Sequence, residues 1–428
     1  MYYKFFWDGD YMASFFVVGG NKINGEISIG GAKNAVLPIL AACALVDGES
    51  IIKNVPNISD VLVAIDILRS LGFKVLHEKN TVVVSGKITN NTISKEYSSK
   101  MRSSITFLGA ILGRTGEATC YFPGGCKLGE RPIELHKKGF SKMGIEVIEN
   151  DDKLICIGKP EAANIMLNFP SVGATQNILL ASVYAKGITI ITNAAKEPEI
   201  IDMANFLNIC GAKIEGAGTE TIIIKGVNKL EGGEYTVMPD RIIAGTYLAA
   251  AAITNGKIVL NNICVKDMQP ITLQFKKMGV DIVTSKNMLI VNAGKSLTSV
   301  NVKTGTHPNF PTDMQAQIMA VLTQAKGTSQ IEENIFEARD KHVTELVKMG
   351  ANITSVLKGR HFFVTGPTKL KSTLVCAEDL RGGAALVIAA LVAEGEMIVK
   401  GTEYIERGYE DIVRDLQLIG ANIYKKED

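Results

Sequence analysis

The sequence predicts an α/β fold built from six copies of one unit, and two recurring patterns support this prediction. The first pattern, an amphipathic helix followed by a glycine and a short β-branched strand, occurs six times along the 428 residues. The second pattern is a helix of small residues, a glycine-containing turn and another strand, as in LAACALVDGESIIKNV, and it lies upstream of the first pattern in each copy. Repetition at a fixed period is typical of folds assembled from repeated structural units.

The junction between helix and strand marks each unit. A glycine directly after a helix adopts the left-handed conformation of the C-cap at no steric cost, so a strand can follow at once. With the upstream helix and turn, each unit reads strand, helix, strand, helix, strand, strand. The junction glycines lie 67 to 72 residues apart, in the segments SLGFKV (Gly72), KMGIEV (Gly144), ICGAKI (Gly211), KMGVDI (Gly279), KMGANI (Gly350) and LIGANI (Gly420).

Six repeats could form a solenoid, in which each unit contacts only its neighbours. The units are twice the usual solenoid length, however, and every helix carries its own apolar face, which favours two closed groups of three units. The segment VMPDRIIAG, residues 237–245, stands where the fourth unit begins. We therefore predict a domain boundary near residue 238.

Composition limits the classes of function. The formal net charge is +2, from 46 basic and 44 acidic residues, which gives no basis for binding nucleic acid or an anionic membrane. The longest apolar stretches fall short of the ~18 residues that a spanning helix needs. The seven cysteines are scattered without zinc-site spacing, so we expect no metal and a reducing, cytoplasmic location. The aromatic start lacks the order of a signal peptide, and we interpret residues 1–11 as a tail.

Two segments carry polar residues suited to binding an anion or to reacting. Neither a GxxxxGK[ST] loop nor a GxGxxG turn after a strand is present, which argues against nucleotide hydrolysis and dinucleotide redox chemistry. In GGAKNAVLPIL, Lys33 and Asn34 follow glycines at the start of a helix, an arrangement that favours an anion, although a solvated lysine is the alternative. In PGGCKLGERPIELH, Cys126 lies near Lys127 and Arg131, which favours a reactive thiol over an incidental loop cysteine.

Further candidates stand at later helix starts. In HPNFPTDMQAQ, Asp313 occupies a predicted N-cap, so that capping is its alternative role. In EDLRGGAAL, Asp379 caps a predicted helix and Arg381 lies in its first turn. Arg339 and Arg407 also directly precede helices. One such arginine would be a surface residue, but several at the same place in successive repeats suggest a shared anion-binding cleft.

These segments together resemble one family, the bacterial UDP-N-acetylglucosamine 1-carboxyvinyltransferases. Its members transfer the enolpyruvyl group of phosphoenolpyruvate to the 3'-hydroxyl of UDP-N-acetylglucosamine, the first committed step of peptidoglycan precursor synthesis. The matching blocks follow one another from about residue 13 to the C-terminus. They are GAKNAVLPIL, MRSSITFLG, PGGCKLGERPIELH, PSVGATQNILLA, AKEPEIIDMANFL, PDRIIAGTYLAAAAI, HPNFPTDMQAQ, IFEARDKHVTEL, DLRGGAALV and IERGYEDI.

The resemblance implies a fold of two inside-out α/β barrel domains, each of three βαβαββ units, with helices inside and sheets outside. Residues 33–238 would form one domain, and residues 12–32 would join 239–428 in the other. The active site would lie in the interdomain cleft. Residues 121–132 would form a mobile loop that carries the cysteine. The expected partners are the two small-molecule substrates, without nucleic acid, membrane or cofactor.

The resemblance also implies a role for individual residues. Cys126 matches the proton donor to C3 of phosphoenolpyruvate, which can also form a covalent adduct, and Asp313 matches the base for the sugar hydroxyl. Lys33 and Arg407 match further residues of the reaction centre, with Asp379 and Leu380 as neighbours. The residues that match phosphoenolpyruvate contacts are Lys33, Asn34, Arg131, Arg339, Arg381 and Arg407. The residues that match UDP-sugar contacts are Arg102, Arg131, Pro132, Ile133, Glu134, Leu135, Ser171, Val172, Gly173, Asp313 and Ile335.

Two departures from the family pattern lie on the UDP-sugar side. Position 134 is Glu where many relatives have Asp, and Phe169-Pro170 stands where some have Lys-Val. Two alternatives remain open: a 5-enolpyruvylshikimate-3-phosphate synthase, which shares the architecture and the donor but lacks this cysteine loop, and a catalytically silent paralogue that binds a UDP-sugar as a sensor.

Overall fold

The computed structural model describes residues 13–122, 124, 133–294, 296–357 and 359–427. Over these ranges the chain forms six four-stranded sheets of one topology. Each sheet contains one parallel pair and two antiparallel pairs. In four sheets the parallel pair is connected directly through a helical crossover, as a parallel connection requires. Four sheets have the order first, second, fourth, third strand along the chain, and in the other two a strand distant in sequence takes one of these positions.

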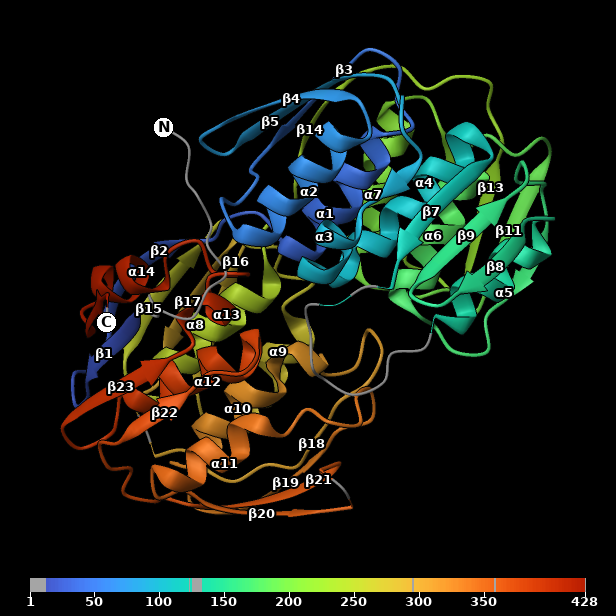
Figure 1. Cartoon of the computed structure of the whole chain (residues 1–428). Helices are drawn as coiled ribbons and strands as arrows, with labels where there is room; N and C mark the ends of the chain where they lie inside the picture. The colour runs from blue at the N-terminus through green and yellow to red at the C-terminus, as the bar shows by residue number, and fades with distance from the viewer. Residues whose placement is uncertain (1–12, 123, 125–132, 295, 358, 428) are drawn as a thin grey trace.

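The sheets and helices form two lobes (Figure 1). We call lobe A the part whose buried apolar residues run from Ala32 to Val237. Its sheets are β14 (Glu234–Thr236), β3 (Glu49–Lys53), β5 (Thr81–Gly86), β4 (Phe73–Glu78); β6 (Thr92–Ile93), β7 (Glu117–Tyr121), β9 (Lys153–Ile157), β8 (Glu146–Asn150); and β10 (Asn164–Met166), β11 (Ile188–Thr192), β13 (Thr221–Lys225), β12 (Lys213–Glu215). Its helices are α1 (Lys33–Cys43), α2 (Ser59–Ser70), α3 (Lys95–Lys100), η1 (Arg102–Ile105), α4 (Thr106–Thr115), α5 (Glu134–Lys142), α6 (Val172–Ser182) and α7 (Pro198–Ile209).

Lobe B is the part whose buried apolar residues come from 15–29 and 242–423. Its sheets are β16 (Asp281–Ser285), β17 (Met288–Asn292), β15 (Lys257–Asn261), β2 (Asn24–Ser28); β18 (Val302–Lys303), β19 (Gly327–Glu332), β21 (His361–Gly366), β20 (Asn352–Val356); and β22 (Leu374–Cys376), β23 (Glu396–Lys400), β1 (Ser14–Val18), β24 (Asn422–Lys426). Its helices are α8 (Arg241–Ile253), α9 (Gln269–Lys277), η2 (Thr312–Met314), α10 (Gln315–Leu322), α11 (Lys341–Lys348), α12 (Leu380–Ala390), α13 (Thr402–Ile405) and α14 (Ile412–Leu418).

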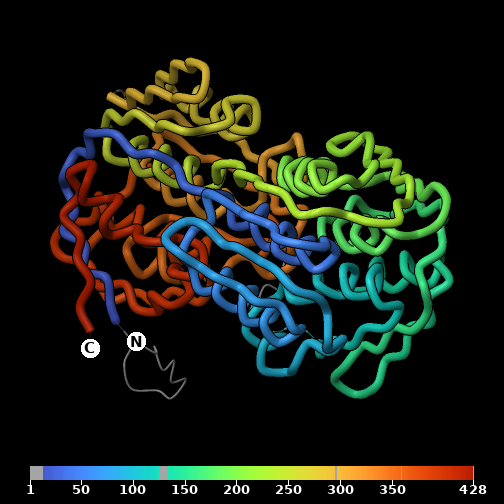
Figure 2. The backbone as a smooth tube through the Cα atoms, turned by 90° about the horizontal axis from the view of Figure 1, so that it is seen from above, coloured from blue at the N-terminus to red at the C-terminus, as the bar shows by residue number. Residues whose placement is uncertain are grey.

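Each lobe is closed by a strand that is distant in sequence. In lobe A, β14 returns to pair in parallel with β3, and in lobe B, β1 inserts between β23 and β24 while β2 pairs with β15. The first and last strands of lobe B therefore lie side by side (Figure 2). A solenoid would have no such returns, so the structure excludes that alternative.

The chain passes between the lobes along two neighbouring segments. Ala32 N donates to the carbonyl oxygen of Met238 at 2.8 Å, and Asp240 N donates to that of Gly30 at 2.9 Å. Gly31 lies so close to Asn54 that an added Cβ would stand 1.7 Å from the Asn54 carbonyl oxygen, which only glycine tolerates. The two crossings thus form a short, tightly packed ribbon.

The layers are inverted relative to most α/β proteins. In both lobes the first helix of each unit, α1, α4, α6, α8, α10 or α12, is buried along nearly its whole length. The sheets turn one face outward, where Met166 is 77% and Ile188 54% exposed. All six junction glycines have φ between 75° and 108°, the left-handed conformation that the sequence predicts for them. No helix within the described ranges is long and apolar enough to cross a membrane.

A buried ion pair joins the lobes next to the crossings. Arg241 of α8 donates through Nε and Nη2 to the two carboxylate oxygens of Glu199 in α7, at 2.9 and 3.2 Å. Both side chains are less than a tenth exposed. Removing one partner of a buried pair leaves the other charge without compensation, which is more costly than losing an exposed pair.

We predict that Glu199→Gln lowers the free energy of unfolding by about 3 kcal/mol, because Arg241 keeps its charge in a buried position. The matched control is Glu220→Gln, whose carboxylate pairs with Lys196 at 2.8 Å while 75% exposed. Urea unfolding of both variants measures the difference. Equal midpoints for the two variants would show that the buried pair does not hold the lobes together.

Candidate functional site

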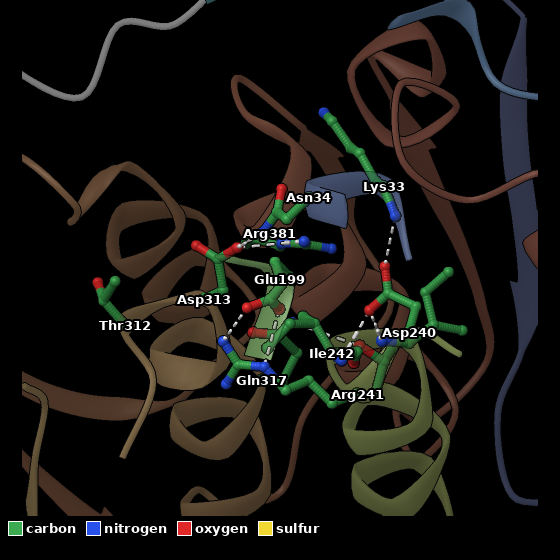
Figure 3. A network of polar contacts seen from close by, with 12 residues as sticks. Lys33, Asn34, Glu199, Asp240, Arg241, Ile242, Thr312, Asp313, Gln317 and Arg381 are labelled. Carbon is green, nitrogen blue, oxygen red and sulfur yellow. Dashed lines mark hydrogen bonds and ion pairs between the residues drawn. The ribbon is translucent and has the colours of Figure 1, made fainter. Parts of the chain in front are cut away.

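The predicted site residues gather where buried helices begin. Lys33 and Asn34 open α1, Asp313 lies in the short turn before α10, and Arg381 is in the first turn of α12 (Figure 3). The starts of α1 and α8 meet directly, because Lys33 N donates to the Asp240 carboxylate at 3.1 Å. Helix N-termini carry partial positive charge and unpaired N–H groups, so their convergence favours a bound anion.

Asp313 is the centre of this arrangement. Its Oδ1 accepts from both terminal nitrogens of Arg339 at 3.1 Å, and its Oδ2 accepts from Arg381 at 3.2 Å and from Asn34 at 3.3 Å. Burial raises the pKa of Asp313, but Arg381 and Arg339 outweigh it and hold the pKa well below its ordinary value. The predicted capping role is wrong: Pro311 is the N-cap of η2, and the Asp313 side chain binds arginines instead.

A second carboxylate, Asp60, links two predicted donor-side cations. Its oxygens lie 2.6 Å from Lys33 Nζ and 3.0 Å from Arg407 Nε, and the residue is 4% exposed. Burial lowers the pKa of Lys33, Asp60 raises it, and Arg407 lowers it further, with a net decrease. Burial raises the pKa of Asp60, while Lys33 and then Arg407 lower it, also with a net decrease. Lys33 and Arg407 thus hold Asp60 in its charged form, while Asp60 opposes the loss of charge that burial favours at Lys33.

Sequence reasoning missed Asp60. It stands in the first turn of α2, where an acidic residue is favoured simply by the helix dipole, so the sequence carries no signal of its contacts. Its partner Arg407 is 347 residues away in the chain and belongs to the other lobe. Asp60 is therefore an interlobe contact as well as a ligand of two cations.

Arg339 is fixed from three sides. Besides Asp313, it donates to Thr312 Oγ1 at 2.8 Å, and its guanidinium lies 4.6 Å from the ring centre of Phe336. Glu333, which was also missed, accepts from Thr312 Oγ1 at 3.0 Å and from the backbone N–H of Ile335 at 2.8 Å. This buried carboxylate holds the segment that carries Ile335 against the turn that carries Asp313.

Asp379 has the capping role that the sequence predicts. Its Oδ1 accepts from the backbone N–H groups of Arg381 at 3.0 Å and Gly382 at 2.9 Å. The cap fixes the first turn of α12, and with it the position from which Arg381 reaches Asp313. Leu380 opens the same turn and is half-buried.

The residues expected on the UDP-sugar side form a second group around His136 of α5. The start of α6 approaches so closely that a Cβ on Gly173 would lie 3.2 Å from His136 Cε1, and Ser171 caps this helix by accepting from Ala174 N at 3.3 Å. Burial, and then the charge of Arg102, lower the pKa of His136 to about 4. The imidazole is therefore neutral, and its Nδ1 lies 2.7 Å from Asn177 Nδ2.

The other residues expected to contact the UDP-sugar differ in how far they are buried. Ile133 is buried and Leu135 half-buried beside this group, and Val172 is the first residue of α6. Glu134, one of the two departures from the family pattern, is exposed and pairs with Lys137 at 2.6 Å. Cys126, Arg131 and Pro132 lie outside the described residues. Their placement therefore stays a prediction.

The residues around Asp60 and Asp313, which we call the first group, carry more positive than negative charge. Four cations, Lys33, Arg339, Arg381 and Arg407, form ion pairs with two carboxylates, Asp60 and Asp313. A third carboxylate, Asp240, accepts from the backbone N–H groups of Lys33, Ile242 and Ile243. Such a surplus suits a small ligand with several negative charges, and arginine forks match carboxylate and phosphate geometry. Over the described residues, no cluster of three or more His, Cys, Asp or Glu side chains could hold a metal ion.

Comparison with known proteins identifies similar chains. Residues 17–416 match the family model described as EPSP synthase (3-phosphoshikimate 1-carboxyvinyltransferase). A protein of Caldanaerobacter subterraneus subsp. tengcongensis named UDP-N-acetylglucosamine 1-carboxyvinyltransferase 2 is 45% identical, over 97% of this chain and 100% of its own length. A Finegoldia magna protein named UDP-N-acetylglucosamine 1-carboxyvinyltransferase is 43% identical, over 95% of this chain and 97% of its own length. The family resemblance drawn from the sequence is confirmed.

Two solved structures share the fold. The enolpyruvyl transferase NikO from Streptomyces tendae has a TM-score of 0.87 at 23% identity, and covers 98% of this chain and 100% of its own. EPSP synthase from Acinetobacter baumannii has a TM-score of 0.75 at 17% identity, over 97% of this chain and 100% of its own. With the six sheets and two buried clusters, these likenesses confirm the predicted fold class of two α/β domains.

We predict that Asp60→Asn weakens the binding of phosphoenolpyruvate progressively as the pH rises above neutrality, and does so at a lower pH than in the wild type. The pKa of Lys33 is already lowered by burial, and without the Asp60 carboxylate it falls further, so the lysine loses its charge at a lower pH. Calorimetric titrations across this pH range measure the effect.

The matched control for Asp60→Asn is Asp66→Asn. Asp66 lies in the same helix but is exposed and pairs with Arg69 at 3.1 Å. If the Asp60 and Asp66 variants bound phosphoenolpyruvate with the same pH profile, Asp60 would not sustain the charge of Lys33.

Proposed function

The chain belongs to the EPSP synthase family, and from this membership we propose that it transfers the enolpyruvyl group of phosphoenolpyruvate to the 3'-hydroxyl of UDP-N-acetylglucosamine. Phosphate is released, and the product is a precursor of peptidoglycan. The observation that carries the proposal is that four cations at converging helix starts share only two ion-paired carboxylates, Asp60 and Asp313. The relatives that are 43–45% identical support this acceptor over shikimate 3-phosphate.

The donor fits the first group of residues. Phosphoenolpyruvate carries a phosphate and a carboxylate, up to three negative charges in all. Lys33 and Arg407 come from different lobes and share Asp60, so an anion between them would replace that carboxylate as their partner. Arg339 and Arg381 share Asp313 in the same way. We propose that these four cations, with Asn34 and Arg131, bind the donor.

The acceptor, UDP-N-acetylglucosamine, would bind at the second group of residues, the one around His136. Arg102 supplies positive charge near the starts of α4 and α6, and Gly173 leaves the N-terminal end of α6 without a side chain that would block approach. We propose that Arg102, Arg131–Leu135 and Ser171–Gly173 contact the UDP-sugar, with Asp313 and Ile335 on the sugar side. In the free protein Glu134 is exposed and pairs with Lys137 at 2.6 Å, so a contact with the UDP-sugar would replace this ion pair.

The addition step needs an acid and a base at once, since C3 of the donor gains a proton while C2 accepts the sugar oxygen. We propose Cys126 as the acid and Asp313 as the base. Asp313 bound to two arginines is a weak base, because they hold its pKa low. A donor that draws Arg339 and Arg381 toward its own negative groups weakens both contacts and raises the pKa of Asp313. Binding of the donor would thus prepare the base.

The two lobes correspond to the two domains that we propose. We propose that residues 33–238 and residues 12–32 with 239–428 act as two domains that close on the substrates, as the two crossing segments and the interlobe pair Asp60–Arg407 support. The substrates are small molecules of the cytoplasm, and the reaction as proposed requires no cofactor.

We predict that the purified protein releases phosphate from phosphoenolpyruvate only when UDP-N-acetylglucosamine is present. Cys126→Ala should lose this turnover while still binding the nucleotide sugar, because the thiol acts in chemistry and not in nucleotide recognition. A phosphate-release assay with shikimate 3-phosphate as the parallel acceptor makes the measurement. Release with shikimate 3-phosphate would indicate an EPSP synthase, and nucleotide binding without any release would indicate a sensor.

We predict that Asp313→Asn lowers turnover roughly 10²-fold or more, the scale of losing a general base. The change also leaves Arg339 and Arg381 without their shared anion, so phosphoenolpyruvate should raise the melting temperature of the variant more than that of the wild type. Turnover and thermal melting with and without donor test both statements. Wild-type turnover in this variant would exclude Asp313 as the base.

A further inference from the structure

Tyr409 lies directly behind the cationic group and has no role in the reaction as proposed above. It belongs to the segment between α13 and α14, two residues after Arg407, and it is 1% exposed. Its ring centre is 5.9 Å from the guanidinium carbon of Arg381. Its hydroxyl oxygen is 2.7 Å from Thr246 Oγ1. Tyr409 thus connects a proposed donor-binding arginine to the core of lobe B.

The direction of the Tyr409–Thr246 hydrogen bond follows from counting protons. Thr246 has one hydroxyl proton and donates it to the Ile242 carbonyl oxygen one turn back in α8, at 2.8 Å. Its oxygen also accepts from Gln317 Nε2 at 3.3 Å. The proton between Thr246 and Tyr409 must therefore belong to Tyr409. Because this proton points into the core, the Tyr409 oxygen can act only as an acceptor toward its other neighbours.

Arg381 needs such an acceptor. One terminal nitrogen, Nη2, donates to Asp313, while the other, Nη1, is buried and has no hydrogen-bond partner among the described residues. Burial lowers the pKa of Arg381, but Asp313 and then Tyr409 raise it above its ordinary value. A guanidinium held by a single carboxylate would follow that carboxylate if it moved. The ring and the acceptor oxygen of Tyr409 form a second, independent support.

The backbone around Tyr409 is also held firmly. A Cβ on Gly408 would lie 2.6 Å from Leu380 Cδ2, and one on Gly383 would lie 2.6 Å from Ile405 Cγ1. The segment from Ile405 to Tyr409 is therefore packed directly on the first turn of α12. Anchoring Tyr409 in the core fixes this segment, and with it the position of Arg407.

We propose that Tyr409 is a positioning residue for the donor. Tyr409 keeps the Arg381 side chain in place when Asp313 releases that arginine, and it fixes the position of Arg407 beside Arg381. This inference rests on the proposed function. If Asp313 is to act as a base, its contact with Arg381 must loosen, and Arg381 must then remain where it can bind a donor anion. Tyr409 performs this task without touching either substrate.

The test compares Tyr409→Phe with Tyr247→Phe. Tyr247 is a matched control, since it is also 1% exposed in lobe B and its hydroxyl donates to Asp415 Oδ2 at 2.7 Å, away from Arg381. Calorimetry with phosphoenolpyruvate alone gives the donor affinity, steady-state assays give the KM for each substrate, and thermal melting reports on stability. We expect about ten-fold weaker donor binding for Tyr409→Phe, because the variant lacks the polar oxygen that acts on the charged Arg381 guanidinium and no longer anchors the ring to Thr246.

The KM for UDP-N-acetylglucosamine should stay unchanged in Tyr409→Phe, and Tyr247→Phe should bind the donor as the wild type does. Thr246→Val, which removes the acceptor of the Tyr409 proton, should weaken donor binding in the same direction. Equal donor affinity in Tyr409→Phe and Tyr247→Phe would overturn the inference, as would a loss that follows melting temperature in both variants. The proposed function is tested separately, because wild-type phosphate release does not depend on this comparison.

Discussion

The structure depends on one constraint, the meeting of buried helix starts next to the crossings between the lobes. The two crossing segments place the starts of α1 and α8 in contact. Asp313, directly before α10, then contacts Arg381 in the first turn of α12 and Asn34 in the first turn of α1. The partial positive charge of these ends is why the lobe interface, and not the exposed faces of the sheets, is suited to anions.

That concentration of charge creates a difficulty for the free protein, since buried cations are costly unless they are paired. Two carboxylates pair with these buried cations. Asp60 pairs with Lys33 and Arg407, and Asp313 pairs with Arg339 and Arg381. In the proposed mode of donor binding, each carboxylate occupies a place that a negative group of the donor takes. On that proposal, binding exchanges one set of ion pairs for another instead of burying bare charges.

Sequence patterns were informative where the controlling interaction is local. The junction glycines, the cap at Asp379 and the repeated order of strands and helices all depend on residues a few positions apart, and each was predicted correctly. Asp60, Glu333 and Tyr409 could not be found in this way, because their partners lie on other elements and in part on the other lobe. Asp313 shows the limit most clearly: its local sequence resembles a cap, but two distant arginines determine its position.

The placement of Asp313 links binding to reactivity. A carboxylate cannot serve fully as the counter-ion of two guanidinium groups and also accept a proton from a sugar hydroxyl, because the same electron pairs are used in both roles. As long as Arg339 and Arg381 face it, they hold its pKa well below the ordinary value, which weakens Asp313 as the proposed base. Base strength must then come from the donor, which competes for the arginines. If Arg381 is held by Tyr409 while Asp313 changes partners, the donor can weaken the ion pair without displacing the arginine that binds it. On this reasoning the acceptor hydroxyl is activated only when the donor is already in place, which couples the two substrates through charge alone.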